Sequence, residues 1–126
     1  MTILQEVLQE LSCPPRLIQV GDAITEVLFF LKRVQNSDGG WGEYPSASSA
    51  VTYVGDALRA FGTIEKPEAA VVQNARNYLL RAQNPDGGWP RYLGGYSDPD
   101  NTTRALVGLL DWGEPASSSA ILNRLA

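Results

Sequence analysis

The sequence predicts an all-α fold built from repeated helical hairpins, and three observations lead to this prediction. The segment Gln-Asn-Ser-Asp-Gly-Gly-Trp at 35–41 returns almost unchanged at 83–89, 48 positions later (83 − 35). Each copy closes a stretch with apolar residues at helical spacing, and no useful stretch alternates as a strand would. A repeat of this length is typical of stacked helix pairs, so we expect one domain over residues 1–126 with about six helices.

The first two helices are predicted from their caps and from apolar residues that recur every three or four positions. Thr2 and Gln5 fit a capping box, and the helix that they begin is expected to stop at Leu11, before two prolines. Asp22 is a suitable N-cap for the second helix, whose apolar side continues to Val34.

The third and fourth helices occupy the middle of the chain. The third is predicted from about Ser48 to Phe61, with Gly62 as the residue that ends it in a left-handed conformation. The fourth is expected to carry Pro67 in its first turn, where a missing backbone N–H does no harm, and to reach Gln83.

The fifth helix is predicted to begin near Asp98 and to end at Trp112, and the sixth to open at Pro115 and continue to Ala126. These helices make two repeat units over about 22–62 and 67–113, followed by an incomplete third unit over 115–126.

The connection before the fifth helix is expected to be longer than its counterpart in the first unit. Thr52 matches Thr103 at a distance of 51 positions (103 − 52), whereas the turns are 48 positions apart. This match predicts three extra residues within 94–98 and pairs Ser49 with Asp100.

Composition excludes several classes of function. The net charge is −4 and the only lysines are Lys32 and Lys66, so no nucleic-acid partner is expected. The chain has no histidine, which excludes Ser–His and Cys–His catalysis and histidine-containing zinc sites, and no metal or cofactor is expected. Cys13 is the only cysteine, so no intrachain disulfide can form. With no secretion leader and no transmembrane segment expected, the predicted location is cytoplasmic, either free or peripheral at a membrane.

The repeated segment, with an aromatic residue or leucine and a basic residue before it, resembles the QW repeat of squalene and oxidosqualene cyclases. The same repeat occurs more widely in prenyltransferase-like proteins. The resemblance covers 27–44 and 77–92 directly. It implies an α/α toroid, of which this chain would form about half, with its odd-numbered helices inside and its even-numbered helices outside. Trp41 and Trp89 are expected to supply apolar area for packing, so the motif itself is interpreted as structural.

The segment Asp98-Pro99-Asp100-Asn101-Thr102 is similar to the DxDDT element of class II terpene cyclases, which protonate an alkene or epoxide. The resemblance implies that Asp100 is the proton donor and that Asp98 and Asn101 hold its geometry. Asn101 stands where the family has an aspartate. The same residues also suit a helix start, with Asp98 as N-cap and Asp100 in the first turn. A helix start lowers a carboxyl pKa, whereas a proton donor needs burial to raise it.

Four aromatic residues are candidates for substrate binding, because aromatic faces stabilise carbocations: Tyr53, Tyr92, Tyr96 and Trp112. The expected function is that of a segment of a class II terpene or squalene cyclase-like isomerase acting on an apolar, isoprenoid-like small molecule. The alternative is a non-catalytic helical-repeat module for binding or interaction. A partial toroid would be completed by a homo-oligomer or by the remainder of a longer chain.

Overall fold

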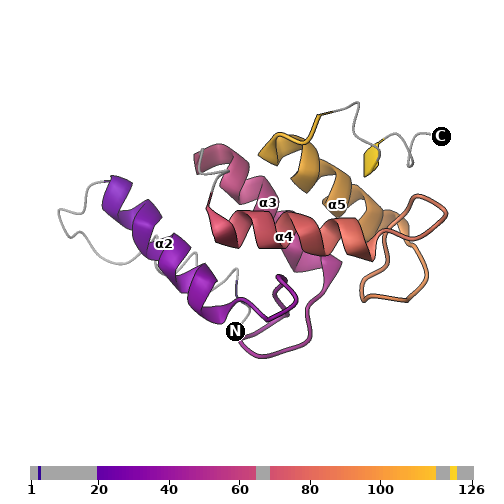
Figure 1. Cartoon of the computed structure of the whole chain (residues 1–126), viewed down its shortest axis with the longest axis horizontal. Coiled ribbons are helices and arrows are strands. Elements are labelled where there is room, and N and C mark those ends of the chain that lie inside the picture. The colour runs from indigo at the N-terminus through magenta and orange to yellow at the C-terminus, as the bar shows by residue number, and fades with distance from the viewer. Residues whose placement is uncertain (1–2, 4–19, 65–68, 116–119, 122–126) are drawn as a thin grey trace.

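The computed structural model describes residues 3, 20–64, 69–115 and 120–121. These residues form no strand, and their helices are α2 (Val20–Val34), α3 (Val51–Ile64), α4 (Ala70–Ala82) and α5 (Pro99–Trp112) (Figure 1). The all-α prediction is confirmed for this part of the chain. All of the predicted helix over 2–11 except Ile3, and most of the predicted helix over 115–126, lie outside the described residues.

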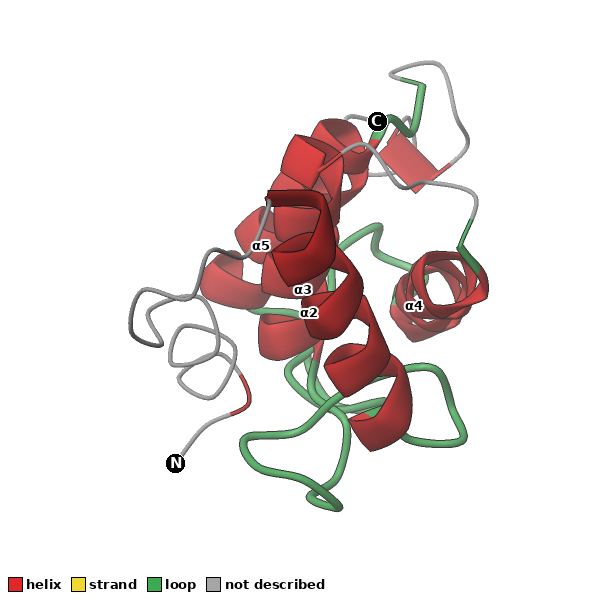
Figure 2. Cartoon of the chain, turned by 90° about the vertical axis from the view of Figure 1, so that its left-hand side faces the viewer, coloured by secondary structure: helices red, strands yellow, loops and turns green. Residues whose placement is uncertain are grey.

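Helices α3 and α5 lie side by side and run in the same direction. Thr52 near the start of α3 contacts Asn101 near the start of α5, and Arg59 near the end of α3 contacts Asp111 near the end of α5. Helix α4 forms a second layer that packs on α3 and contacts α2 (Figures 1 and 2).

Glycines allow α3 and α5 to approach closely. A Cβ atom on Gly108 would lie 2.3 Å from the carbonyl oxygen of Gly55, and one on Gly62 would lie 2.1 Å from that of Asp111. The prediction that Gly62 ends its helix was wrong, since α3 continues to Ile64. This glycine makes room for the neighbouring helix, which is a tertiary requirement and leaves no local mark in the sequence.

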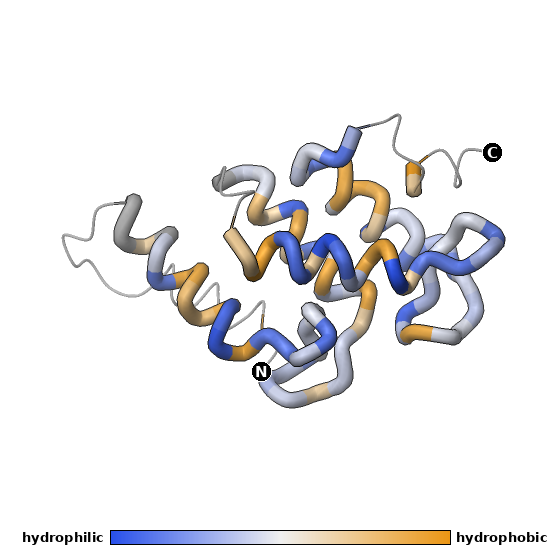
Figure 3. Tube along the Cα trace, viewed as in Figure 1, coloured by the Kyte–Doolittle hydropathy of each residue, from blue (hydrophilic) through white to orange (hydrophobic). Residues whose placement is uncertain are grey.

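The core lies between the two layers and is built largely from aromatic and branched side chains. Trp41 and Trp89 of the two turns are fully buried, as is Tyr78 of α4. Apolar and polar segments alternate along α4 (Figure 3), and its buried residues follow the helical period: Val71, Val72, Ala75, Tyr78, Leu79 and Ala82.

The starts of three helices also differ from the predictions. Helix α2 begins at Val20, so Asp22 lies inside the helix and the prediction of an N-cap there was wrong. The reason is visible in the spacing, because Val20 continues the apolar pattern one turn back from Ile24. Helix α3 begins at Val51, three residues later than predicted, because backbone bonds to the turns hold the preceding residues.

Helix α4 begins at Ala70, after Ala69 in an extended conformation, while Pro67 is outside the described residues. The prediction for α5 is confirmed. It starts at Pro99 with Asp98 as N-cap and ends at Trp112.

Candidate functional site

The two repeated turns use their glutamines to join consecutive parts of the chain. Nε2 of Gln35 donates to the carbonyl oxygen of Gly39 in its own turn at 2.8 Å and to that of Val71 in α4 at 3.0 Å. Gln83 repeats this arrangement, donating to Gly87 at 3.0 Å and to Ala120 at 2.9 Å. Each glutamine therefore ties a turn to the helical segment of the following unit, which is a structural role.

The asparagine, aspartate and serine of each turn form a second repeated network. In the first turn, Asn36 Nδ2 donates to Ser49 Oγ at 2.9 Å, and that hydroxyl donates to Asp38 Oδ1 at 2.6 Å. In the second, Asn84, Ser97 and Asp86 make the same bonds at 2.9 and 2.8 Å. Backbone N–H groups of Gly40 and Gly88 donate to the same carboxylate oxygens.

Both tryptophans bond back to the helix that precedes their turn. Trp41 Nε1 donates to the carbonyl oxygen of Leu31 at 3.0 Å, and Trp89 Nε1 donates to that of Leu79 at 2.7 Å. The indoles are thus buried and their N–H groups are satisfied, as expected of structural residues.

These networks correct the predicted insertion within 94–98. Ser97 occupies the place of Ser49, 48 positions earlier, and the N–H of Asp98 bonds to Trp89 as that of Ala50 bonds to Trp41. The repeat period therefore stays at 48 residues through the connection before α5, and that connection has no extra residues. By the same register the counterpart of Asp100 is Thr52, and the predicted pairing of Asp100 with Ser49 was wrong.

The side chain of Asp98 accepts hydrogen bonds from Asn101 at the start of α5. Its Oδ1 accepts from the backbone N–H of Asn101 at 2.8 Å, and its Oδ2 accepts from Asn101 Nδ2 at 2.9 Å. The backbone N–H of Asn101, followed by its side-chain amide, lowers the pKa of Asp98 below its ordinary value. Asp98 is therefore a charged N-cap in this structure.

Asn101 and Thr102 are buried and connect α5 to its surroundings. Asn101 Oδ1 accepts from the hydroxyl of Thr52 in α3 at 2.6 Å. Thr102 Oγ1 accepts from the backbone N–H of Trp89 at 2.9 Å. The segment 98–102 thus joins α3, α5 and the second turn.

Asp100 is exposed on the surface of α5. Its side chain is 67% accessible and pairs with Arg104, one turn later in the same helix, at 3.1 Å. Arg104 also pairs with Asp56 of α3 at 2.6 Å. The described residues therefore provide no desolvated pocket around Asp100 in which a carboxyl would retain its proton.

Asp56 is a carboxyl that no sequence motif marks. Burial raises the pKa of Asp56 above its ordinary value, and this effect outweighs the opposing attraction of Arg104. Finding it requires knowing that α3 and α5 are neighbours, because Asp56 and Arg104 are 48 positions apart in the chain.

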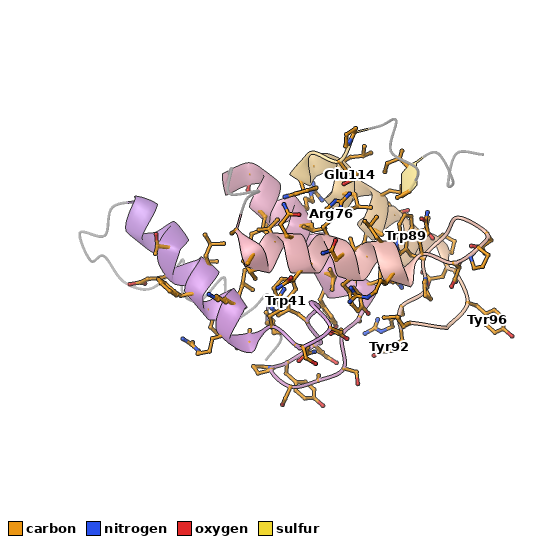
Figure 4. The ribbon with its side chains drawn as sticks, viewed as in Figure 1. Trp41, Arg76, Trp89, Tyr92, Tyr96 and Glu114 are labelled. Atoms are coloured by element: carbon orange, nitrogen blue, oxygen red, sulfur yellow. The ribbon has the colours of Figure 1, made fainter. Side chains whose placement is uncertain are left out.

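The four aromatic candidates do not gather at one place. Arg91 lies over the rings of both Tyr53 and Tyr92, 5.8 and 5.5 Å from their centres, so these two are close. Tyr96 is 97% exposed and points away from the molecule (Figure 4). Trp112 is at the opposite end of α5 from Asp100, about 18 Å away along the helix.

Trp112 lies beside an ion pair that sequence reasoning missed. Arg76 of α4 lies 5.7 Å from the centre of the Trp112 ring and pairs with the buried Glu114 through two bonds of 2.7 and 3.0 Å (Figure 4). The N–H of Glu114 bonds to Leu109, so this residue continues the end of α5.

An open pocket of about 970 Å³ lies beside the first turn. Its lining comes mainly from that turn and its following loop, with two residues of the loop that follows the second turn: Asn36, Ser37, Asp38, Glu43, Tyr44, Ser46, Ala47, Ser48, Ser49, Tyr92 and Leu93. Of the predicted substrate-binding residues only Tyr92 belongs to this lining.

No protein-family profile matches the chain, and no curated protein is significantly similar to it. Within residues 20–64 and 69–115, no helix has the length and apolar character needed to cross a membrane. The described part of the chain also has no group of three or more Asp, Glu, Cys or His residues placed to hold a metal ion.

Changing Asn101 to aspartate would complete the family-like acidic element and is expected to destabilise the fold. The new carboxylate would lie beside Asp98, where Asn101 Nδ2 is now 2.9 Å from Asp98 Oδ2. Two like charges raise each other's pKa in the folded state, so the destabilisation is present at pH 7 and shrinks as the pH falls toward 4. We expect the free energy of unfolding to fall by about 2 kcal/mol at pH 7, measured by chemical denaturation.

The matched control is Thr52→Val, which removes the bond to Asn101 Oδ1 without adding charge. Thr52→Val should lower the free energy of unfolding by the same amount at pH 7 and at pH 4. An Asn101→Asp loss that is equally independent of pH would contradict a charged Asp98.

Proposed function

We propose that the chain is a non-catalytic helical-repeat binding module on a scaffold of the QW-repeat type. The observation that carries this proposal is the surroundings of the two carboxyl groups in the 98–102 segment. Asp98 is engaged as a charged N-cap, and Asp100 is exposed and paired with Arg104. Neither carboxyl has the surroundings that a proton donor for an alkene requires.

The scaffold is proposed to be a partial α/α toroid. The bonds from Gln35 to α4 and from Gln83 to Ala120 support a stack in which each turn holds the next unit. The parallel pair of α3 and α5 supports an inner layer, and α4 supports an outer one. A second copy of this chain, or further units of a longer one, would close the toroid.

A second candidate function is that of a class II terpene cyclase acting on an apolar polyprenoid. Two observations favour it. The second unit has Asp98 and Asp100 where the first has Ala50 and Thr52, so the acidic residues are not needed for the repeated turn. In addition, Asp56, whose pKa is raised by burial, lies on the other side of Arg104 from Asp100. In this function Asp100 would donate the proton, with Asp98 and Asn101 positioning it.

Product analysis distinguishes the two functions. The protein would be incubated with squalene and, separately, with farnesyl and geranylgeranyl diphosphates, and extracts would be searched for cyclised products. The module predicts none. Product that disappears in Asp100→Asn or Asp56→Asn would establish the cyclase and overturn the module.

The control for those variants is Asp111→Asn. Asp111 is an exposed carboxyl that pairs with Arg59 at the other end of the same two helices, 3.3 Å away. Its replacement removes an equivalent surface ion pair without touching the 98–102 segment, so product formation should be unaffected by it.

A further inference from the structure

The open pocket beside Tyr44 and Tyr92 has the volume of a ligand site. Its volume of about 970 Å³ is at the upper end of the range of small-molecule pockets, roughly 300–1,000 Å³. Because Tyr92 and Leu93 of the second unit complete a lining that otherwise comes from the first unit, a bound molecule would contact both repeat units. The pocket is distinct from the 98–102 segment, which contributes nothing to its lining.

Each turn presents a tyrosine to this pocket. Tyr44 and Tyr92 are 48 positions apart and therefore equivalent, and they are 56% and 49% exposed. The tryptophans of the same turns are fully buried. Exposed rings stabilise the fold little, whereas a tyrosine face with a hydroxyl at its edge suits contact with a ligand that is partly apolar and partly polar.

The charges of the lining disfavour an anionic ligand. Asp38 and Glu43 contribute carboxylates, and no lysine or arginine is among the described lining residues. Phosphate groups are usually held by arginine, lysine or clustered backbone N–H groups. Prenyl diphosphates and nucleotides are therefore poor candidates.

Neighbouring guanidinium groups disfavour a cationic ligand. Arg91 already lies over the ring of Tyr92, 5.5 Å from its centre. Arg81 of α4 donates to the backbone carbonyl of Asp38. A ligand cation at either place would meet a positive charge, so the carboxylates are balanced and a neutral ligand fits best.

We propose that this pocket binds a neutral oligosaccharide that extends from Tyr44 to Tyr92. The apolar C–H faces of sugar rings would pack on the tyrosines, and sugar hydroxyls would bond to the carboxylates of Asp38 and Glu43 and to the hydroxyl of Ser48. This inference rests on the proposed function, since it names the ligand class of the binding module.

The test is a titration of the isotope-labelled protein with maltohexaose and, separately, with cellohexaose, followed by backbone amide NMR. We expect at least one of them to shift the signals of residues 36–49 and 91–93 while the signals of α4 stay in place. Tyr44→Ala and Tyr92→Ala should each weaken binding about tenfold. Tyr96→Ala is the matched control, because Tyr96 is exposed and is not part of the lining, and it should bind as the unaltered protein does.

If tetramethylammonium shifts these signals and neither sugar does, the pocket is a cation site and the saccharide assignment is overturned, while the binding module stands. If neither sugar shifts them, or if Tyr96→Ala weakens binding as much as the other two variants, the proposal is likewise overturned. Only cyclised product in the assay above would overturn the proposed function itself. Circular dichroism of each variant would establish that it is folded.

Discussion

Replacement of Arg76 by methionine is expected to lower the free energy of unfolding by about 3–5 kcal/mol. Arg76 holds the carboxylate of Glu114 through two short bonds, and that side chain is only 4% exposed. Without the guanidinium, a charge is left buried and unpaired, which costs far more than a surface ion pair contributes. Chemical denaturation at pH 7 would measure the loss.

The double variant Arg76→Met with Glu114→Leu separates this cause from lost packing on Trp112. Because it removes both charges and keeps apolar volume, it should recover much of the stability that Arg76→Met loses. A double variant as unstable as the single one would show that contact with Trp112, and not the buried charge, explains the effect.

Gly108→Ala is expected to lower the free energy of unfolding by about 3 kcal/mol. Alanine normally stabilises a helix interior relative to glycine by about 1 kcal/mol. Here the added methyl group would lie 2.3 Å from the carbonyl oxygen of Gly55, which is backbone and cannot rotate away. Helices α3 and α5 would have to move apart, so the bond between Thr52 and Asn101 would also weaken.

Ala60 provides the control for this prediction, since it occupies the position of Gly108 in the first unit, 48 residues earlier, and is exposed. Ala60→Gly should cost only about 1 kcal/mol, the ordinary helix preference. Thermal and chemical denaturation of both variants would be compared. A Gly108→Ala protein more stable than the unaltered one would show that α3 and α5 are not in close contact.

The helices and turns could be predicted well because their signals are local. Apolar spacing located α2 to α5, and the aspartate and proline before α5 marked its start correctly. The turn residues were interpreted as structural from their types, and the hydrogen bonds of Gln35 and Trp41 agree with that interpretation.

The register between the units could not be predicted in the same way. A shift of three residues along a helix leaves apolar residues on nearly the same face, so the match of Thr52 with Thr103 was as plausible as the correct one. The hydrogen bonds of Ser49 and Ser97 fix the register, and they depend on folded loops.

Ion pairs between side chains on different helices also could not be predicted from the sequence. Asp56 meets Arg104, and Glu114 meets Arg76, only because particular helices are neighbours. A charged residue on a predicted helix is usually solvated, so neither carboxyl stood out before the packing was known. The same holds for the open pocket, which brings Tyr44 and Tyr92 together although they are 48 residues apart in sequence.

Segment 98–102 begins a helix, and Asp98 is a charged cap within it. The most direct measurement is an NMR titration of the Asp98 side-chain carboxyl carbon in the folded protein. The hydrogen bonds from Asn101 predict a pKa below the ordinary 3.8, so that the stabilisation by Asp98 is present at neutral pH and is lost as the pH falls through the folded value. A pKa above 3.8 would contradict this, because it would show that the hydrogen bonds from Asn101 do not stabilise the charged form of Asp98.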